Sequence, residues 1–219
     1  MRSDVLPGMT SPPNLQEWFG QIDIYLFDQL LKGRFAPRMR VLDAGCGGGR
    51  NLVYFLRCGY DVCGVDVSGE AVAHVRALAS GLAPHLPADN FRVEAVEEMS
   101  FADGGFDVVL SSAVLHFARD EEHWQGMVRE MWRVLKPGGV FFARLASSIG
   151  MEEKIIRLDG RRYRLPDGSD RFLVDERMLL AATDSLGGEW IEPLKTVVVQ
   201  NLRSMSTWCL RKSSPPARR

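Results

Sequence analysis

A glycine-rich turn sets the strongest constraint on how this chain can fold. The apolar run 39–44 leads directly into GCGGG, which has glycines at 45, 47 and 49. Glycine has no Cβ and adopts positive φ freely, so a strand that enters such a turn can bring its backbone close to a ligand. The free N–H groups of a helix that follows favour a polar or anionic group there. The turn therefore predicts a ligand site at the edge of a sheet.

Strands and helices alternate after this turn. N-cap residues at Ser68 and Asp120 open helical patterns, and apolar runs lie between the helices. Further strands are predicted at 60–65, 91–96, 107–111 and 140–146. Such an alternation is typical of a parallel sheet with helices on both faces. We predict an α/β, doubly wound, Rossmann-like sheet of seven strands, mostly parallel with an antiparallel last strand.

Composition argues against several classes of protein. The net charge is −1, and about −5 without the four basic residues Arg211, Lys212, Arg218 and Arg219, so a folded body lacks the basic stripe of a nucleic-acid platform. No run approaches the ~20 apolar residues that span a bilayer, and no secretory signal is visible. We predict a cytoplasmic protein without nucleic-acid or membrane partners. The four cysteines form no C-x-x-C pair, so we predict neither disulfides nor a metal.

An acidic residue at the end of the second strand identifies the kind of ligand. Asp66 follows the run 60–65 and lies 21 residues after Gly45. At this place in a βαβ unit, a carboxylate accepts hydrogen bonds from the two hydroxyls of a ribose. The turn and the acid together predict a nucleoside.

The glycine spacing and a nearby charge distinguish between two nucleosides. A nicotinamide site requires G-x-G-x-x-G, and the place of the third glycine is occupied by Arg50. Asp43, two residues before the first glycine, would repel a pyrophosphate and attract an ammonium or sulfonium group. The charge therefore indicates S-adenosylmethionine as the cofactor.

Four segments together resemble the class I S-adenosylmethionine-dependent methyltransferases. They are VLDAGCGGG, GVD, FADGGFDVVLSSAVLHF and MWRVLKPGGVFF, within about residues 38–145. GCGGGRN followed by GYDV is most similar to the small-molecule branch of the tellurite-resistance and thiopurine type. The resemblance implies an enzyme that moves a methyl group from S-adenosylmethionine to a small molecule by in-line displacement.

The resemblance also implies which residues hold the cofactor. Gly45 and Gly47 would lie under its methionine part, with Asp43 near the amino group and Ser111 near the amine and the sulfonium. The nucleoside half would lie against a second set of residues. In that set Asp66 would bind the ribose, and Val67, the backbone of Val96 and Glu97 would face the adenine. Glu97 would substitute for an acid that the family often has at the position of Ala95.

Transfer from an activated sulfonium depends mainly on the placement of the acceptor and on the exclusion of water. An acceptor oxygen or nitrogen that carries a proton also benefits from a base. His116, just beyond the fourth strand, is the histidine nearest to the expected methyl position and is our candidate catalytic residue. A thiol or a neutral amine would need no base.

We predict a single methyltransferase domain at 15–212 between flexible tails at 1–14 and 213–219. Its expected parts are an N-terminal helix in 15–35, a cofactor-binding core at 36–146, a hairpin insert at 147–175, and a closing helix and strands at 176–212. Two other functions stay open, a non-catalytic module that binds S-adenosylmethionine and, less favoured, a nicotinamide oxidoreductase. The pattern specifies neither the acceptor nor the oligomeric state.

Overall fold

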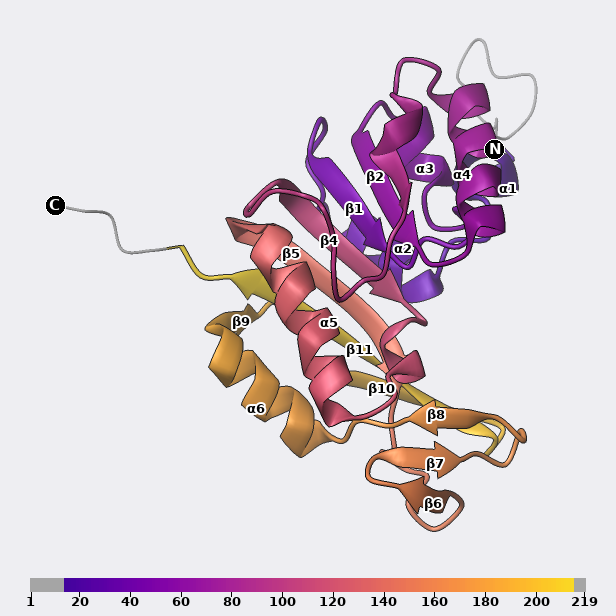
Figure 1. The fold of residues 1–219 in the computed structure, drawn as a ribbon, viewed down its shortest axis with the longest axis vertical. Coiled ribbons are helices and arrows are strands. Elements are labelled where there is room, and N and C mark those ends of the chain that lie inside the picture. Colours follow the sequence, from indigo (N-terminus) through magenta and orange to yellow (C-terminus); the bar gives the residue numbers. More distant parts are fainter. Residues whose placement is uncertain (1–13, 215–219) are drawn as a thin grey trace, which may run out of the picture.

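A computed structural model describes residues 14–214 and contains a central sheet with helices on both faces (Figure 1). The strands lie in the order β10 (Lys195–Val199), β11 (Arg203–Lys212), β5 (Leu135–Ala146), β4 (Phe106–Ser112), β1 (Arg40–Ala44), β2 (Asp61–Asp66) and β3 (Phe91–Val93). The strands from β5 to β3 are parallel, and β11 is antiparallel to both its long neighbours. This confirms the predicted fold. The short β9 (Gly188–Trp190) pairs with β11 as an eighth strand.

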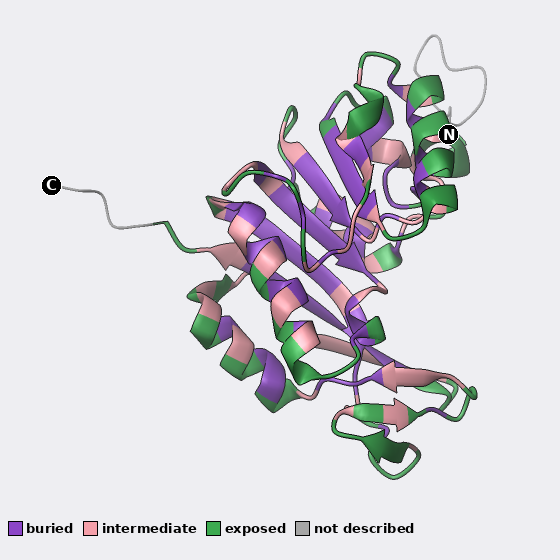
Figure 2. Ribbon diagram, in the orientation of Figure 1, coloured by how far each residue is buried: buried purple, intermediate pink, exposed green. Residues whose placement is uncertain are grey.

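Helices divide the core into two layers. One face carries α2 (Ile24–Leu31), α3 (Val53–Arg57) and α4 (Gly69–Leu82), and the other carries α5 (Glu121–Val134) and α6 (Glu176–Leu186). The strands between these layers are almost fully buried (Figure 2), which explains their continuous apolar runs. None of the helices in the described part of the chain has the length and apolar character needed to cross a membrane.

The N-terminal segment forms two helices and not the single helix predicted from its apolar pattern. α1 (Leu15–Phe19) ends at Gly20, where φ is +60° and a Cβ would lie 2.8 Å from Cγ2 of Val53. The chain therefore turns at a position that favours glycine. Asp23 then caps α2 by accepting a hydrogen bond of 2.9 Å from the backbone N–H of Tyr25. The break brings Asp23 to the carboxyl ends of β4 and β5.

Several boundaries differ from the sequence pattern. The third strand is shorter than predicted and is followed by a loop, and α4 continues through Gly81 to Leu82. A 3₁₀ helix, η1 (Ala88–Asn90), precedes β3. β5 begins at Leu135, directly after α5, and is therefore longer than the predicted strand at 140–146.

The segment after β5 forms a small separate sheet. Within the insert predicted at 147–175, a hairpin turn at Gly160 joins β6 (Ile156–Asp159) to β7 (Arg162–Arg164), and β8 (Asp170–Phe172) adds a third strand. Figure 1 shows this sheet beyond the end of the central sheet, close to the carboxyl end of β5. The predicted tails lie almost entirely outside the described residues.

Candidate active site

The glycine-rich turn joins β1 to α3 at the carboxyl edge of the sheet. Gly45, Gly47 and Gly49 have φ values of +85°, +50° and +83°. A Cβ on Gly45 would lie 2.3 Å from Cγ2 of Val114, and one on Gly49 would lie 2.7 Å from Cγ2 of Val75. Gly47 differs, since among residues 14–214, apart from itself and its two chain neighbours, no heavy atom lies within 4 Å of such a Cβ. The turn is thus tightly packed on two sides and open at Gly47.

Asp66 lies at the end of β2 and contacts this turn. Its Oδ2 accepts a hydrogen bond of 2.9 Å from the backbone N–H of Gly47, and its Oδ1 accepts one of 2.9 Å from that of Ser68. Each carboxylate oxygen can accept a further hydrogen bond. The structure therefore places a half-buried acid next to the open part of the turn, where it can also receive hydroxyl donors.

Asp43 lies in β1 directly before the turn and is 1% exposed. Neither of its carboxylate oxygens has a hydrogen-bond partner among the described residues, and the same is true of the buried hydroxyl of Ser111 on the adjacent β4. Burial raises the pKa of Asp43 to about 7, although the charge of Arg50 opposes this, and the charge of Asp66 adds to it. An isolated buried charge is costly, so a cationic ligand group would be stabilised here. These orphaned polar groups fit the ammonium end of S-adenosylmethionine.

The three residues predicted to face the adenine differ in their exposure and in their contacts. Val67 is 73% exposed just beyond β2, whereas Val96 is buried in the core that includes Val65. Glu97 is engaged elsewhere, because its Oε1 lies 2.9 Å from Nε2 of His123 at the start of α5. The structure therefore brings Asp43, the turn and Asp66 together, while Glu97 is shared with α5.

His116 lies on the 3₁₀ helix η2 (Leu115–Phe117), which follows β4. It is 8% exposed, and its Nδ1 has no partner among residues 14–214. Burial and the positive charges of Arg171 and Arg203 lower the pKa of His116 to about 4. The imidazole is therefore neutral near pH 7 but binds a proton weakly. A general base works best when its pKa is near the working pH, so His116 is better suited to orient an acceptor than to deprotonate it.

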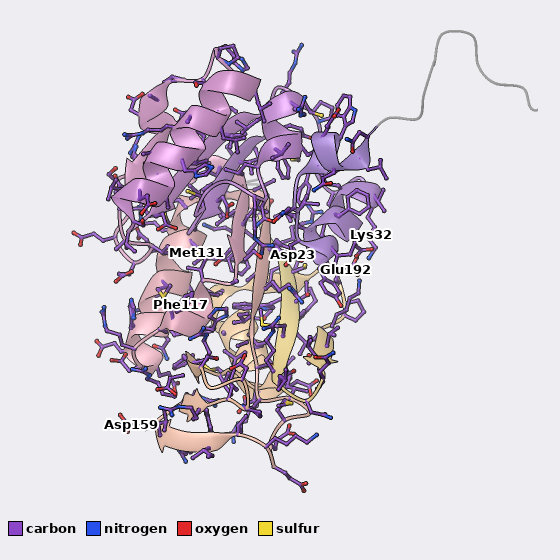
Figure 3. The ribbon with its side chains drawn as sticks, turned by 90° about the vertical axis from the view of Figure 1, so that its right-hand side faces the viewer. Asp23, Lys32, Phe117, Met131, Asp159 and Glu192 are labelled. Atoms are coloured by element: carbon purple, nitrogen blue, oxygen red, sulfur yellow. The ribbon has the colours of Figure 1, made fainter. Side chains whose placement is uncertain are left out.

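A polar cluster between α2 and the strand ends was not predicted from the sequence. Asp23 is 4% exposed, and its Oδ2 lies 3.0 Å from Nη1 of Arg144 and 3.3 Å from Oγ of Ser112. Nη2 of Arg50 donates to the same hydroxyl at 3.2 Å. Figure 3, in which the molecule is turned by 90° from the view of Figure 1, labels Asp23 near the centre of the view. The one local signal for the cluster is Arg144, a charged residue within an otherwise apolar strand.

Metal and cysteine chemistry have little support in the described part of the chain. No three His, Cys, Asp or Glu side chains gather there in a way that could hold a metal ion. Cys46, Cys63 and Cys209 are buried, Cys58 is exposed, and all four are free thiols.

The strand order, the open glycine turn and the acid at the end of β2 are those of a Rossmann-like domain. Residues 42–143 match a family model described as a methyltransferase domain. This match supports a methyltransferase domain in this segment.

Two curated relatives are similar over this region. An uncharacterized methyltransferase of Synechocystis sp. is 33% identical over 106 residues, which are 48% of this chain and 46% of the relative. A malonyl-[acyl-carrier protein] O-methyltransferase of Enterobacter lignolyticus is 30% identical over 165 residues, 75% of this chain and 59% of the relative. The chain thus spans about half the length of the curated relatives it matches.

Solved structures share the fold at low sequence identity. An S-adenosylmethionine-dependent methyltransferase of Methanosarcina mazei has a TM-score of 0.69 at 21% identity, covering 85% of this chain and 98% of its own. The 1,6-didemethyltoxoflavin-N1-methyltransferase of Burkholderia thailandensis, with bound S-adenosylhomocysteine, scores 0.67 at 21% identity, covering 90% and 81%. The [4+2]-cyclase SpnF scores 0.64 at 19% identity, covering 86% and 81%. The cyclase illustrates that a fold alone does not determine a reaction.

Proposed function

We propose that this protein is a methyltransferase that moves a methyl group from S-adenosylmethionine to a small-molecule acceptor. The observation that carries the proposal is Asp43, a buried carboxylate without a partner among the described residues, directly before a turn that is open at Gly47. A ligand with a positive group and a ribose suits Asp43 and Asp66 together. A dinucleotide does not, because its pyrophosphate would meet the negative charge of Asp43.

The residues of the chain would mainly bind and orient the reactants. Bound S-adenosylmethionine supplies an activated methyl group, so the protein needs to place the acceptor in line with it and exclude water. Asp66 and the backbone of Gly47 would orient the nucleoside half, while Asp43 and Ser111 would hold the amino end. On the acceptor side, the neutral His116 would position the acceptor through a hydrogen bond at Nδ1.

A small-molecule acceptor is supported by two observations. The toxoflavin-type methyltransferase that shares this fold is named for a small-molecule substrate. The run GCGGGRN favours the small-molecule branch of the tellurite-resistance and thiopurine type.

Titration calorimetry of the purified protein with S-adenosylmethionine, S-adenosylhomocysteine and NAD tests the proposal. We expect binding of the first two and not of NAD. Asp66→Ala should weaken binding of S-adenosylhomocysteine by about 2 kcal/mol, or roughly 30-fold, because charge-assisted hydrogen bonds are lost. Asp61→Ala is the matched control, since Asp61 is an exposed acid at the opposite end of the same strand. A preference for NAD, or equal losses in the two variants, would contradict the proposal.

Catalysis is tested separately from binding. Formation of S-adenosylhomocysteine is measured with a panel of thiols, amines, phenols and carboxylates as acceptors. Product formation with any member supports the methyltransferase. Tight cofactor binding without product across the panel would favour the non-catalytic binding module.

A further inference from the structure

The segment between β5 and α6 has balanced charges in number but contains an arginine, Arg171, without an acidic partner among the described residues. Residues 147–175 contain six basic and six acidic side chains. In space, Arg164 pairs with Asp170 and Arg161 pairs with Asp175. Arg171 has no carboxylate oxygen within 4 Å among the residues that the structure describes. An equal count of charges therefore leaves a guanidinium group without an acidic partner.

Arg171 lies on the opposite face of the small sheet from Arg162 and Arg164 and on the same face as Arg157. It pairs with Tyr163 on β7, so alternation along the strands places Arg162 and Arg164 on the opposite face. The guanidinium carbon of Arg171 lies 4.9 Å from the ring centroid of Phe117, the residue after His116. Arg171 thus lies over η2, the short helix that carries His116.

A second arginine approaches the same place from β11. Nη1 of Arg203 lies 3.9 Å from Oδ2 of Asp167, a long ion pair. Burial lowers the pKa of His116 most, and the charges of Arg171 and Arg203 lower it further, so both guanidinium groups lie within electrostatic range of the imidazole. Two guanidinium groups, one carboxylate and a neutral imidazole leave one net positive charge. The orphaned Nδ1 of the more than nine-tenths buried His116 adds a polar atom that still needs a partner.

We propose that Arg171, Arg203 and His116 bind a carboxylate group on the methyl acceptor, which makes the acceptor a small organic monoanion. Guanidinium groups form paired, charge-assisted hydrogen bonds with a planar carboxylate. One net positive charge matches one carboxylate, whereas a phosphate would bring up to two negative charges. The inference rests on the proposed function, and it names the acceptor class for that function.

Benzoate and benzamide are the probes, because they share a shape and differ in charge. Each is titrated into protein saturated with S-adenosylhomocysteine, while NMR follows the imidazole signal of His116, assigned from its loss in His116→Gln. We expect benzoate to shift this signal saturably and to raise the pKa of His116, and benzamide to do neither. Arg171→Gln and Arg203→Gln should each weaken benzoate binding at least about tenfold. Arg162→Gln, on the other face of the small sheet, should leave it unchanged.

Three results would overturn the inference: equal effects of benzoate and benzamide, no saturable effect of benzoate, or benzoate binding that survives both arginine variants. The affinity for S-adenosylhomocysteine is measured in the same samples. Normal affinity without a benzoate effect refutes only the carboxylate site. If the wild-type protein does not bind S-adenosylhomocysteine at all, the proposed function is refuted, and the proposed acceptor class is refuted with it.

Discussion

Asp43→Asn should stabilise the protein in the absence of its cofactor, even though it alters the proposed site. Burial raises the pKa of Asp43 from its ordinary 3.8 to about 7. Since each pH unit corresponds to about 1.4 kcal/mol, this difference amounts to about 4 kcal/mol. The unfolded chain loses this proton near pH 4 and the folded chain only near pH 7. Between these values the folded state binds more protons, so the free energy of unfolding falls as the pH rises.

Urea denaturation at about pH 4.5, 5.5, 7 and 8.5 measures this effect. The stability difference between Asp43→Asn and the wild type should grow by about 1.4 kcal/mol per pH unit and level off at about 4 kcal/mol above pH 7. Asp107→Asn is the control. Burial raises the pKa of Asp107, but hydrogen bonds from Lys136 and Arg40 outweigh this and lower it, so the control should destabilise the protein at neutral pH. A pH-independent effect of Asp43→Asn would refute the reasoning.

The same substitution should have the opposite effect on cofactor binding. An ammonium group next to Asp43 favours the charged carboxylate, so binding near pH 7 releases a proton and tightens as the pH rises. Calorimetry with S-adenosylhomocysteine in buffers of different ionisation enthalpy measures the released proton. In Asp43→Asn the affinity should be lower and the proton release should be absent. Unchanged proton release would place the titrating group elsewhere.

Two further substitutions test the packing of the site by urea denaturation. Gly45→Ala should lower the free energy of unfolding by at least about 1–2 kcal/mol from its positive φ alone, and a clash with Val114 should lower it further. Val114→Ala in the same chain should remove that clash and restore part of the loss. Strictly additive losses in the double variant would contradict the assigned contact. Asp23→Ala should cost about 3 kcal/mol, because it removes the cap of α2 and leaves Arg144 without its carboxylate. Asp23→Asn keeps a capping oxygen and should cost less, and equal losses would show that the cap contributes nothing.

The central fold was predictable because its signals are local. The strands that form the middle of the sheet are continuous apolar runs, and buried parallel strands require such runs. Ser68, Asp120 and Asp175 each cap a helix through a side-chain oxygen, as short-range patterns indicate. The prediction of a single N-terminal helix was wrong because the signal that breaks it is not local. Its apolar face is periodic, and the break at Gly20 is set by a contact with the distant Val53.

The residues of the candidate site likewise fall into those that local spacing identifies and those that only the folded chain brings together. Asp43 and the glycines are consecutive, and Asp66 follows at a fixed interval in a βαβ unit, so spacing identifies them. Asp23 and Arg144 are separated by 121 residues, and only the folded sheet edge brings them together. The charges of residues 147–175 balance in number, but pairing depends on which face of the small sheet each arginine occupies. Glu97 was selected by its position, and no sequence pattern indicated that His123 would contact it.

Asp43 and His116 perform complementary roles in the free protein. A buried acid with a pKa of about 7 and a buried histidine with a pKa of about 4 both have their charged forms disfavoured by burial. The positive group of the cofactor would stabilise the charged form of Asp43, and the negative group of the acceptor would stabilise the charged form of His116. The cofactor would draw a proton out of Asp43, and a carboxylate near His116 would raise its affinity for one. The two proposed binding steps should therefore respond to pH in opposite directions, cofactor binding tightening and carboxylate binding weakening as the pH rises.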